Sequence, residues 1–334
     1  MIKVGIIGFG YWGNNIVRNF YKNQNFKIEK VADKRLDRLK ILNQSYPSIK
    51  TTTDPTEILT DPSIDAVAIV TPVFTHFQFA KDALENGKHV LLEKPMTTKT
   101  SEAEKLIDLT IQKNLSLMVD HTFLYTGAVQ KMKQLISSEV IGKIQYFDST
   151  RINLGLFQSD INVLWDLAPH DISILSHLFS EKPYSLNATG VSHTHNGLEN
   201  IAYLTVNYES GMIAHFNCSW SSPVKIRMML IGGDKKMIVF NDLEPTEKIK
   251  IYDTGYTIKN YNEKQNILID YRTGDIFIPK TPMTEALSLM VEDFAQSIKN
   301  RSLPVSDYNS GLNVVRILEA SNRSLMNKGS EVII

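Results

Sequence analysis

The chain has 334 residues, of which 43% are hydrophobic and 22% charged, and its 36 basic residues balance its 36 acidic ones. This is the composition of an ordinary globular protein with room for two domains, and the zero net charge argues against nucleic acid as the main partner. No apolar run approaches the length of a membrane span, and the chain opens on an apolar strand in place of a signal peptide. A single cysteine, Cys218, excludes an intrachain disulfide and fits a reducing cytoplasm. Together these features predict a cytoplasmic protein without a membrane partner.

The strongest local pattern lies at the start of the chain. An apolar run at residues 2–7 is followed by Gly8-Phe9-Gly10-Tyr11-Trp12-Gly13, a helical segment at 14–21 and a second strand at 27–33. This order is the dinucleotide-binding fingerprint, in which the first glycine permits a tight turn and the second lets the backbone approach a pyrophosphate. The third lets the helix pack on the strand. A glycine-rich turn without a ligand is the alternative, and the strand before it and the helix after it disfavour that interpretation.

An acidic residue, Asp33, ends the second strand. Its carboxylate can accept hydrogen bonds from both hydroxyls of an adenosine ribose, and it would repel a 2′-phosphate. NAD is therefore the predicted cofactor. Lys34 and Arg35 follow directly and could pair with such a phosphate, which leaves NADP as an alternative.

Strands and helices alternate as far as about residue 120. The predicted helices are 36–45, 77–86 and 101–113, and the predicted strands are 65–70, 89–95 including the strand's exit, and 115–120. This alternation predicts a doubly wound parallel sheet in a domain at 1–121. Ligands of such sheets bind outside the carboxyl ends of the strands. The exits predicted to converge there carry Gly8 to Gly13, Asp33, Thr71-Pro72 with His76, Glu93-Lys94-Pro95, and His121.

The pattern changes in the second predicted domain, residues 122–334. Helices are predicted at 128–138, 167–179, 285–299 and 310–327, and strand-like runs fill most of 185–252. Ser210-Gly211 and Gly232-Gly233 are hairpin signals between these runs. The sequence therefore predicts an α/β protein whose second domain is α+β, with a large, mostly antiparallel open sheet.

Lys94 is the first candidate for chemistry. It stands at a strand exit between Glu93 and Pro95, and the proline restricts it to extended backbone angles. A lysine held in a crevice can donate or accept a proton. The alternative is an ordinary surface lysine in a loop.

Asp166 and His170 are the second candidate. They are four residues apart in a predicted helix, so they share a face, and a carboxylate can orient an imidazole that accepts a proton. Removal of hydride from an alcohol carbon needs such a base. Alternatively, Asp166 is the helix N-cap and His170 a first-turn residue, because Pro169 suits a first turn.

The remaining histidines indicate no metal site. His193 and His195 lie at a probable hairpin tip with no carboxylate or cysteine in register, so no metal is predicted.

Together these motifs resemble the glucose–fructose oxidoreductase, inositol dehydrogenase and rhizopine-catabolism (Gfo/Idh/MocA) family, over essentially the whole chain. The resemblance implies a nicotinamide cofactor, a homodimer or homotetramer formed through the C-terminal sheet, and oxidation or reduction of a sugar or cyclitol hydroxyl. It makes Lys94 the active-site lysine, His170 the acid/base and Asp166 its partner. The predicted cofactor contacts are Gly8, Phe9, Gly10, Tyr11, Trp12, Gly13, Asp33, Lys34, Thr71, Pro72, His76, Glu93, Lys94 and Pro95. The predicted substrate contacts are His121, Tyr125, Arg151, Asn153 and Trp165.

Some segments depart from the commonest family pattern. Many members have glycines where this chain has Asn162 to Trp165, and many have an Asn-Arg-Arg-Phe type segment in place of His121 to Tyr125. The latter segment and Arg272 to Pro279 are similar to members that act on nucleotide sugars in surface-polysaccharide pathways. The predicted reaction is therefore at C3 of a nucleotide-linked sugar of the UDP-N-acetylhexosamine type. The alternatives are a myo-inositol, free aldose or dihydrodiol dehydrogenase, and a non-catalytic nicotinamide-binding regulator.

Overall fold

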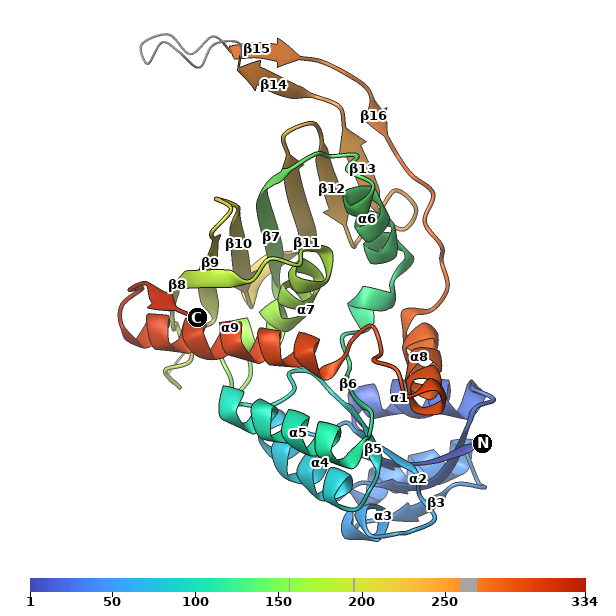
Figure 1. The fold of residues 1–334 in the computed structure, drawn as a ribbon. Coiled ribbons are helices and arrows are strands. Elements are labelled where there is room, and N and C mark those ends of the chain that lie inside the picture. The colour runs from blue at the N-terminus through green and yellow to red at the C-terminus, as the bar shows by residue number, and fades with distance from the viewer. Residues whose placement is uncertain (156, 195, 259–268) are drawn as a thin grey trace. The chain divides into compact units, whose positions relative to one another are not determined.

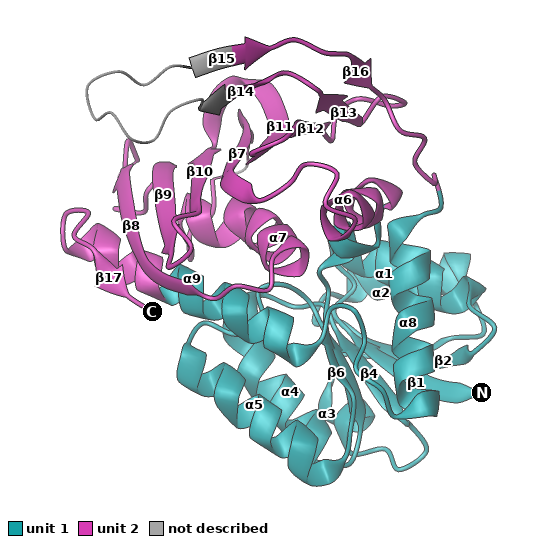
Figure 2. Ribbon diagram, turned by 45° about the horizontal axis from the view of Figure 1, so that its top comes forward, with its two compact units in different colours: residues 1–126, 284–319 teal, residues 127–283, 320–334 magenta. Residues whose placement is uncertain are grey.

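The computed structural model of the chain describes residues 1–155, 157–194, 196–258 and 269–334. They divide into two compact units, coloured separately in Figure 2. Unit 1 comprises Met1–Thr126 and Thr284–Glu319, and unit 2 comprises Gly127–Met283 and Ala320–Ile334. The predicted domains are continuous, at 1–121 and 122–334, whereas unit 1 takes a second segment from the C-terminal part of the chain.

Polar contacts explain why this second segment belongs to unit 1. Glu285 pairs with Arg18 on the first helix, and Glu292 accepts hydrogen bonds from Asn23 and Asn25. No local pattern in residues 284–319 indicates these partners, which lie at the other end of the sequence.

The core of unit 1 is a parallel sheet with the strand order β3-β2-β1-β4-β5-β6. This confirms the predicted doubly wound sheet. The order reverses direction between β1 and β4, and that switch point is where such sheets bind ligands. The strands are β1 (Ile2–Ile7), β2 (Phe26–Ala32), β3 (Lys50–Thr52), β4 (Ala66–Ile69), β5 (His89–Leu92) and β6 (Leu117–Val119).

Helices cover both faces of this sheet (Figure 1). Because the crossovers on the two sides of β1 run in opposite directions, a right-handed connection places their helices on opposite faces. Gly87, with φ +74°, follows Asn86, the C-cap of α4, in the left-handed conformation that favours glycine after a helix. The helices are α1 (Tyr11–Lys22), α2 (Leu36–Ser45), α3 (Thr56–Leu59), η1 (Val73–Thr75), α4 (His76–Glu85), α5 (Thr100–Lys113), η2 (Thr122–Tyr125), α8 (Ala286–Asn300) and α9 (Tyr308–Met326), whose last residues belong to unit 2.

The core of unit 2 is a sheet with the strand order β16-β13-β12-β11-β7-β10-β9-β8-β17. Among its described strands β7 and β10 run parallel and the other neighbours run antiparallel, which confirms the predicted mostly antiparallel sheet. The strands of this unit, including the separate β14–β15 pair, are β7 (Ile144–Leu154), β8 (Pro183–Val191), β9 (Ile201–Tyr208), β10 (Ile213–Ser219), β11 (Ser221–Gly233), β12 (Met237–Asn241), β13 (Ile249–Tyr252), β14 (Gly255–Ile258), β15 (Ile269–Arg272), β16 (Ile276–Phe277) and β17 (Val332–Ile333).

One face of this sheet is covered by α7 (Val163–Leu178), which packs against β7, β9 and β10, and α6 (Gly127–Ser137) packs beside α7. Alternate residues of β7, namely Phe147, Ser149 and Arg151, are buried, as the two-residue period of a strand with one covered face requires. Among the described helices none combines the length and apolar character that a membrane crossing requires.

We predict that Gly8→Ala destabilises the protein by about 3 kcal/mol or more. Gly8 has φ +101°, and an added Cβ would lie 2.2 Å from the carbonyl oxygen of Val70, so strain and overpacking add together. Gly87→Ala is the matched control, since its φ is also positive but nothing lies within 4 Å of the added Cβ. It should lose about 1–2 kcal/mol. Urea unfolding measures both, and equal losses would contradict the prediction.

Candidate active site

The glycine-rich loop of unit 1 has the geometry of a phosphate cradle. A Cβ on Gly13 would lie 2.5 Å from the carbonyl oxygen of Gly8, so the loop closes tightly on itself. At Gly10, by contrast, an added Cβ would meet Arg38 Nη1 at 3.4 Å and no other described atom within 4 Å. Gly10 is also the N-cap of α1, where no described side chain caps the helix. The loop therefore fits a dinucleotide pyrophosphate, whose oxygens suit open N–H groups at a helix start. The adjacent Tyr11 and Trp12 are exposed.

Asp33 locks this loop to the end of β2. Its Oδ2 accepts the Phe9 N–H at 2.7 Å, and its Oδ1 accepts the Arg35 N–H at 2.8 Å. The carboxylate is nearly buried, and these two hydrogen bonds fix its orientation.

The basic residues after Asp33 differ in their availability. Arg35 forms a two-point ion pair with Asp37, whereas Lys34 is exposed. Arg38, which sequence reasoning missed, has its Nη1 3.5 Å from Asp33 Oδ2 and close to Gly10. The signal for Arg38 was its position in the first turn of the helix that follows the acid.

His76 joins two strand exits. Its Nδ1 lies 2.9 Å from the Pro95 carbonyl oxygen, and its Nε2 lies 2.8 Å from that of Thr71. Burial lowers the pKa of His76, so the ring is neutral and donates one of these two hydrogen bonds. Both nitrogens face the backbone, so His76 positions the loops of the predicted cofactor site instead of offering a ring nitrogen to the cofactor. Pro72 lies exposed in the same loop.

A cluster of buried ionisable groups surrounds Lys94 at the ends of β5 and β6. The Glu93 carboxylate accepts the backbone N–H of Lys94 at 2.6 Å, and Asp120 accepts hydrogen bonds from Thr122. Burial and the Asp120 carboxylate raise the pKa of Glu93 to about 8, and burial also raises the pKa of Asp120. Burial and the Lys94 ammonium lower the pKa of His121 to about 3, so this fully buried imidazole is neutral. Shifted groups of this kind gather at functional sites.

Tyr125 does not suit its predicted role as a substrate contact. Its hydroxyl donates to Asp293 Oδ2 at 2.7 Å and lies 3.1 Å from Ser306 Oγ, and the side chain is 5% exposed. Burial raises its pKa. Tyr125 ties η2 to the segment around α8, and the segment that supplies its partners is distant in the sequence.

The start of α7 differs from the sequence prediction. The helix begins at Val163 and its N-cap is Asn162, whose side-chain oxygen accepts the Trp165 N–H at 3.3 Å. The alternative in which Asp166 caps the helix is therefore wrong. Asp166 lies inside the first turn, where its Oδ2 accepts the indole N–H of Trp220 at 2.9 Å. His170 follows one turn later.

Trp220 and its surroundings complete this half of the candidate site. Trp220 was missed because it follows β10, far from α7 in the sequence. Its ring approaches Phe157, with centroids 5.7 Å apart. Asn153, predicted to contact substrate, is half-buried and lies near the C-terminal end of β7. Trp165, predicted likewise, is 5% exposed and belongs to the core under α7.

Arg151 is buried against α7, which argues against its predicted contact with a substrate carboxylate or phosphate. Its Nε lies 2.9 Å from Asp171 Oδ1 and its Nη2 lies 2.5 Å from the same oxygen. Ser149 donates to Asp171 Oδ2 at 2.7 Å. The side chains of Arg151 and Asp171 are 3% and 2% exposed. The pair joins β7 to α7 next to His170.

Within the described residues no group of three or more histidine, cysteine, aspartate or glutamate side chains could hold a metal ion. His195, half of the histidine pair considered above, lies outside the described residues.

We predict that Glu93→Gln flattens the pH dependence of stability. The pKa of Glu93 is raised from 4.5 to about 8, so between these values the unfolded chain is ionised there and the folded chain is not. The free energy of unfolding of the parent protein should therefore fall as the pH rises through this window, by up to about 1.4 kcal/mol per pH unit. Urea unfolding across the window should show a shallower fall for Glu93→Gln and an unchanged fall for the exposed Glu85→Gln. Equal slopes in all three proteins would refute it.

We also predict that Asp171→Asn lowers the free energy of unfolding by about 3–5 kcal/mol, because it leaves a buried guanidinium without its countercharge. The double variant Arg151→Met/Asp171→Leu should lose less, since it removes both charges together. Denaturant unfolding of the single and double variants tests the pair. A loss below about 1 kcal/mol in Asp171→Asn is incompatible with a buried charge pair.

Comparison with known proteins identifies the family of both units. A model of the oxidoreductase family with an NAD-binding Rossmann fold matches residues 2–121, and a model of the GFO/IDH/MocA C-terminal domain matches residues 129–239. The chain is 28% identical over 308 residues to the UDP-N-acetylglucosamine 3-dehydrogenase of Acidithiobacillus ferrooxidans, covering 89% of this chain and 88% of that protein. It is 25% identical over 350 residues to the scyllo-inositol 2-dehydrogenase (NADP(+)) IolW of Bacillus subtilis, covering 98% and 94%.

A solved structure of the Acidithiobacillus ferrooxidans enzyme has the same fold, with a TM-score of 0.81 over 98% of each chain at 24% identity. Both compact units thus have their counterpart in one family. The chain belongs to the Gfo/Idh/MocA family of NAD(P)-dependent oxidoreductases.

Proposed function

We propose that this chain oxidises or reduces a sugar at C3, on a nucleotide-linked sugar of the UDP-N-acetylhexosamine type. The observation that carries the proposal is the fixed carboxylate of Asp166, which Trp220 Nε1 holds at 2.9 Å one helical turn before His170. A carboxylate so placed stabilises an imidazolium that forms on the same helix face. The intact lysine in the Glu93-Lys94-Pro95 exit adds a second proton-handling group.

His170 takes the hydroxyl proton of the substrate in the oxidative direction and returns it in the reductive direction. Asp166 positions His170. Lys94 donates a hydrogen bond to the reacting oxygen, and its ammonium group is itself held among the buried Glu93, Asp120 and His121. A bound nicotinamide would supply or accept the hydride.

The cofactor site favours NAD and tolerates NADP. Asp33 is held where it can accept ribose hydroxyls, because the Phe9 and Arg35 backbone N–H groups fix its two oxygens. Arg38 is the cation best placed for a 2′-phosphate, since Arg35 forms an ion pair with Asp37. The cofactor contacts are those named from the sequence, with His76 acting through the loops it joins.

Relatives support the substrate class at different levels of detail. Sugar and cyclitol dehydrogenases both occur among them, and one relative named for UDP-N-acetylglucosamine aligns with 89% of this chain. The alternative to a nucleotide sugar is a cyclitol substrate, the class for which the scyllo-inositol 2-dehydrogenase relative is named. A regulator without catalysis is disfavoured because Lys94, Asp166 and His170 are all present.

We further propose that the chain assembles as a homodimer or homotetramer through the face of the unit 2 sheet that α7 leaves uncovered. Tyr203 and Ile213 lie on neighbouring strands and are 46% and 45% exposed, which suits a contact face.

The buried thiol of Cys218 suits a cytoplasmic protein.

We predict that Lys94→Ala and His170→Ala each lower turnover by at least about 100-fold, as loss of a positioned acid or base does. NAD+ affinity should stay within a few-fold, because neither side chain is proposed to carry the cofactor's phosphates. Lys99→Ala, which removes an exposed lysine from the same loop, should retain the parent turnover. The measurement is steady-state kinetics that follow nicotinamide absorbance.

The substrate panel decides between the candidates. UDP-N-acetylglucosamine should be turned over and free myo-inositol should not. Near-normal turnover of both alanine variants would remove the proposed mechanism. Cofactor binding without hydride transfer to any sugar of the panel would favour the regulator.

A further inference from the structure

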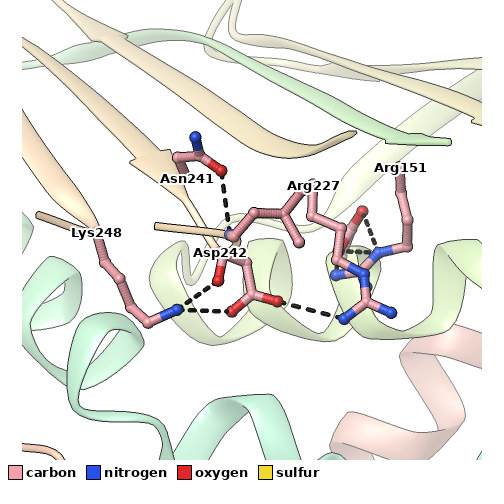
Figure 3. A network of polar contacts seen from close by, with 7 residues as sticks. Arg151, Arg227, Asn241, Asp242 and Lys248 are labelled. Carbon is pink, nitrogen blue, oxygen red and sulfur yellow. Dashed lines mark hydrogen bonds and ion pairs between the residues drawn. The ribbon is translucent and has the colours of Figure 1, made fainter. Parts of the chain in front are cut away.

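A charged cluster lies on the sheet of unit 2, beside the Arg151–Asp171 pair. It consists of Arg227 on β11, Asp242 just after β12, and Lys248 just before β13, and we call it the Arg227 cluster (Figure 3). No local sequence motif indicates this cluster, because its members lie on or next to three different strands.

The pairing register places Arg227 on the face of the sheet that α7 covers. Arg227 is directly opposite Arg151 in the antiparallel pair of β11 and β7, and opposite residues of such a pair point to the same face. The side chain of Arg151 reaches Asp171 on α7, which identifies that face. Asp171 follows His170, so Arg227 lies one strand away from the ion pair that anchors the proposed acid/base.

The two arginines differ in how fully their donors are used. The Nε and Nη2 groups of Arg151 donate to the Asp171 carboxylate at 2.5–3.0 Å. The nearest carboxylate oxygen to Arg227 is Asp242 Oδ2, 3.4 Å from Nη1. The Nε of Arg227 is buried and has no hydrogen-bond partner among the described residues. Most buried donors in folded proteins are hydrogen-bonded, so the Nε of Arg227 is an exception.

The charges around Arg227 also favour an anion. Asp242 is shared, because Lys248 Nζ lies 3.4 Å from its Oδ1 and donates to its backbone carbonyl oxygen. Arg151, Arg227 and Lys248 together face the two carboxylates of Asp171 and Asp242, which leaves one positive charge in excess. The side chain of Arg227 is 32% exposed, so a ligand can reach it.

We propose that Arg227 binds an anionic oxygen group of the substrate and thereby selects charged sugars over neutral ones. The inference rests on the proposed function and names the feature of the substrate that this site recognises. A guanidinium suits phosphate and carboxylate oxygens because its planar N–H groups match their geometry. The anion is the diphosphate of a nucleotide sugar or the carboxylate of a sugar acid. In a nucleotide-linked hexose the phosphate is attached to C1, which is two ring carbons from C3.

Binding of simple anions tests this without requiring turnover. Isothermal titration with UDP, D-glucuronate and neutral myo-inositol is carried out on the parent protein, Arg227→Gln, Asp242→Asn and Arg323→Gln. Arg323 is an exposed arginine on α9 and is the control for loss of one positive charge. Arg227→Gln should weaken binding of UDP or of D-glucuronate by at least about tenfold, while Arg323→Gln should not. Asp242→Asn should strengthen binding of the same anion, because it removes a competing carboxylate from Arg227.

The two anions distinguish the source of the charged group. Weakened binding of UDP identifies a nucleotide-linked sugar, and weakened binding of D-glucuronate identifies a sugar acid. Unchanged anion binding in Arg227→Gln, or a parent protein that binds neither anion, overturns the inference. Opposite shifts in Arg227→Gln and Asp242→Asn cannot come from a general loss of structure. If Arg227 controls anion binding but no sugar is turned over, the proposed reaction fails and the anion site stands.

Discussion

The buried ion pair of Arg151 and Asp171 is the interaction on which the packing of α7 in unit 2 depends. Both side chains are buried between α7 and β7, where a lone charge would be poorly solvated, so each requires the other. The pair fixes α7 against β7 at the residue after His170, and Asp166 is fixed by Trp220 at the other end of the same stretch. The neighbouring Arg227 differs, because its buried Nε has no hydrogen-bond partner among the described residues.

Unit 1 uses burial differently. The carboxyl ends of β5 and β6 bring Glu93, Asp120 and His121 around Lys94, and burial shifts the pKa of all three neighbours toward their neutral forms. Burying such groups does not favour folding, and their concentration at the ligand-binding edge of a parallel sheet is typical of a functional site. Asp33 at the end of β2 holds the glycine-rich loop through the Phe9 N–H.

Much of the fold followed from local patterns. The helix predicted at 36–45 is α2 with the same bounds, and the alternation up to residue 120 produced the parallel sheet. Predictions failed where a capping residue was not recognised or where a partner was distant in the sequence. The start of α7 was missed because Asn162 caps it, and the return of α8 to unit 1 depends on contacts with residues near the N-terminus. For the site, the positions of Lys94 and Asp33 at strand exits were predictable, whereas the burial of Arg151 and Tyr125 was not.

The amino-acid sequence by itself determined the glycine-rich turn, the periodicity of the elements and the family motifs, because turn chemistry and side-chain period depend on residues close together in the chain. Only the tertiary structure decided which charged side chains are satisfied. The register of β11 against β7 sets Arg227 opposite Arg151, and the packing of α7 gives Asp171 to Arg151. A charge finds its partner through space, and in a low-dielectric interior that partner decides whether an arginine holds the fold together or remains open to a ligand.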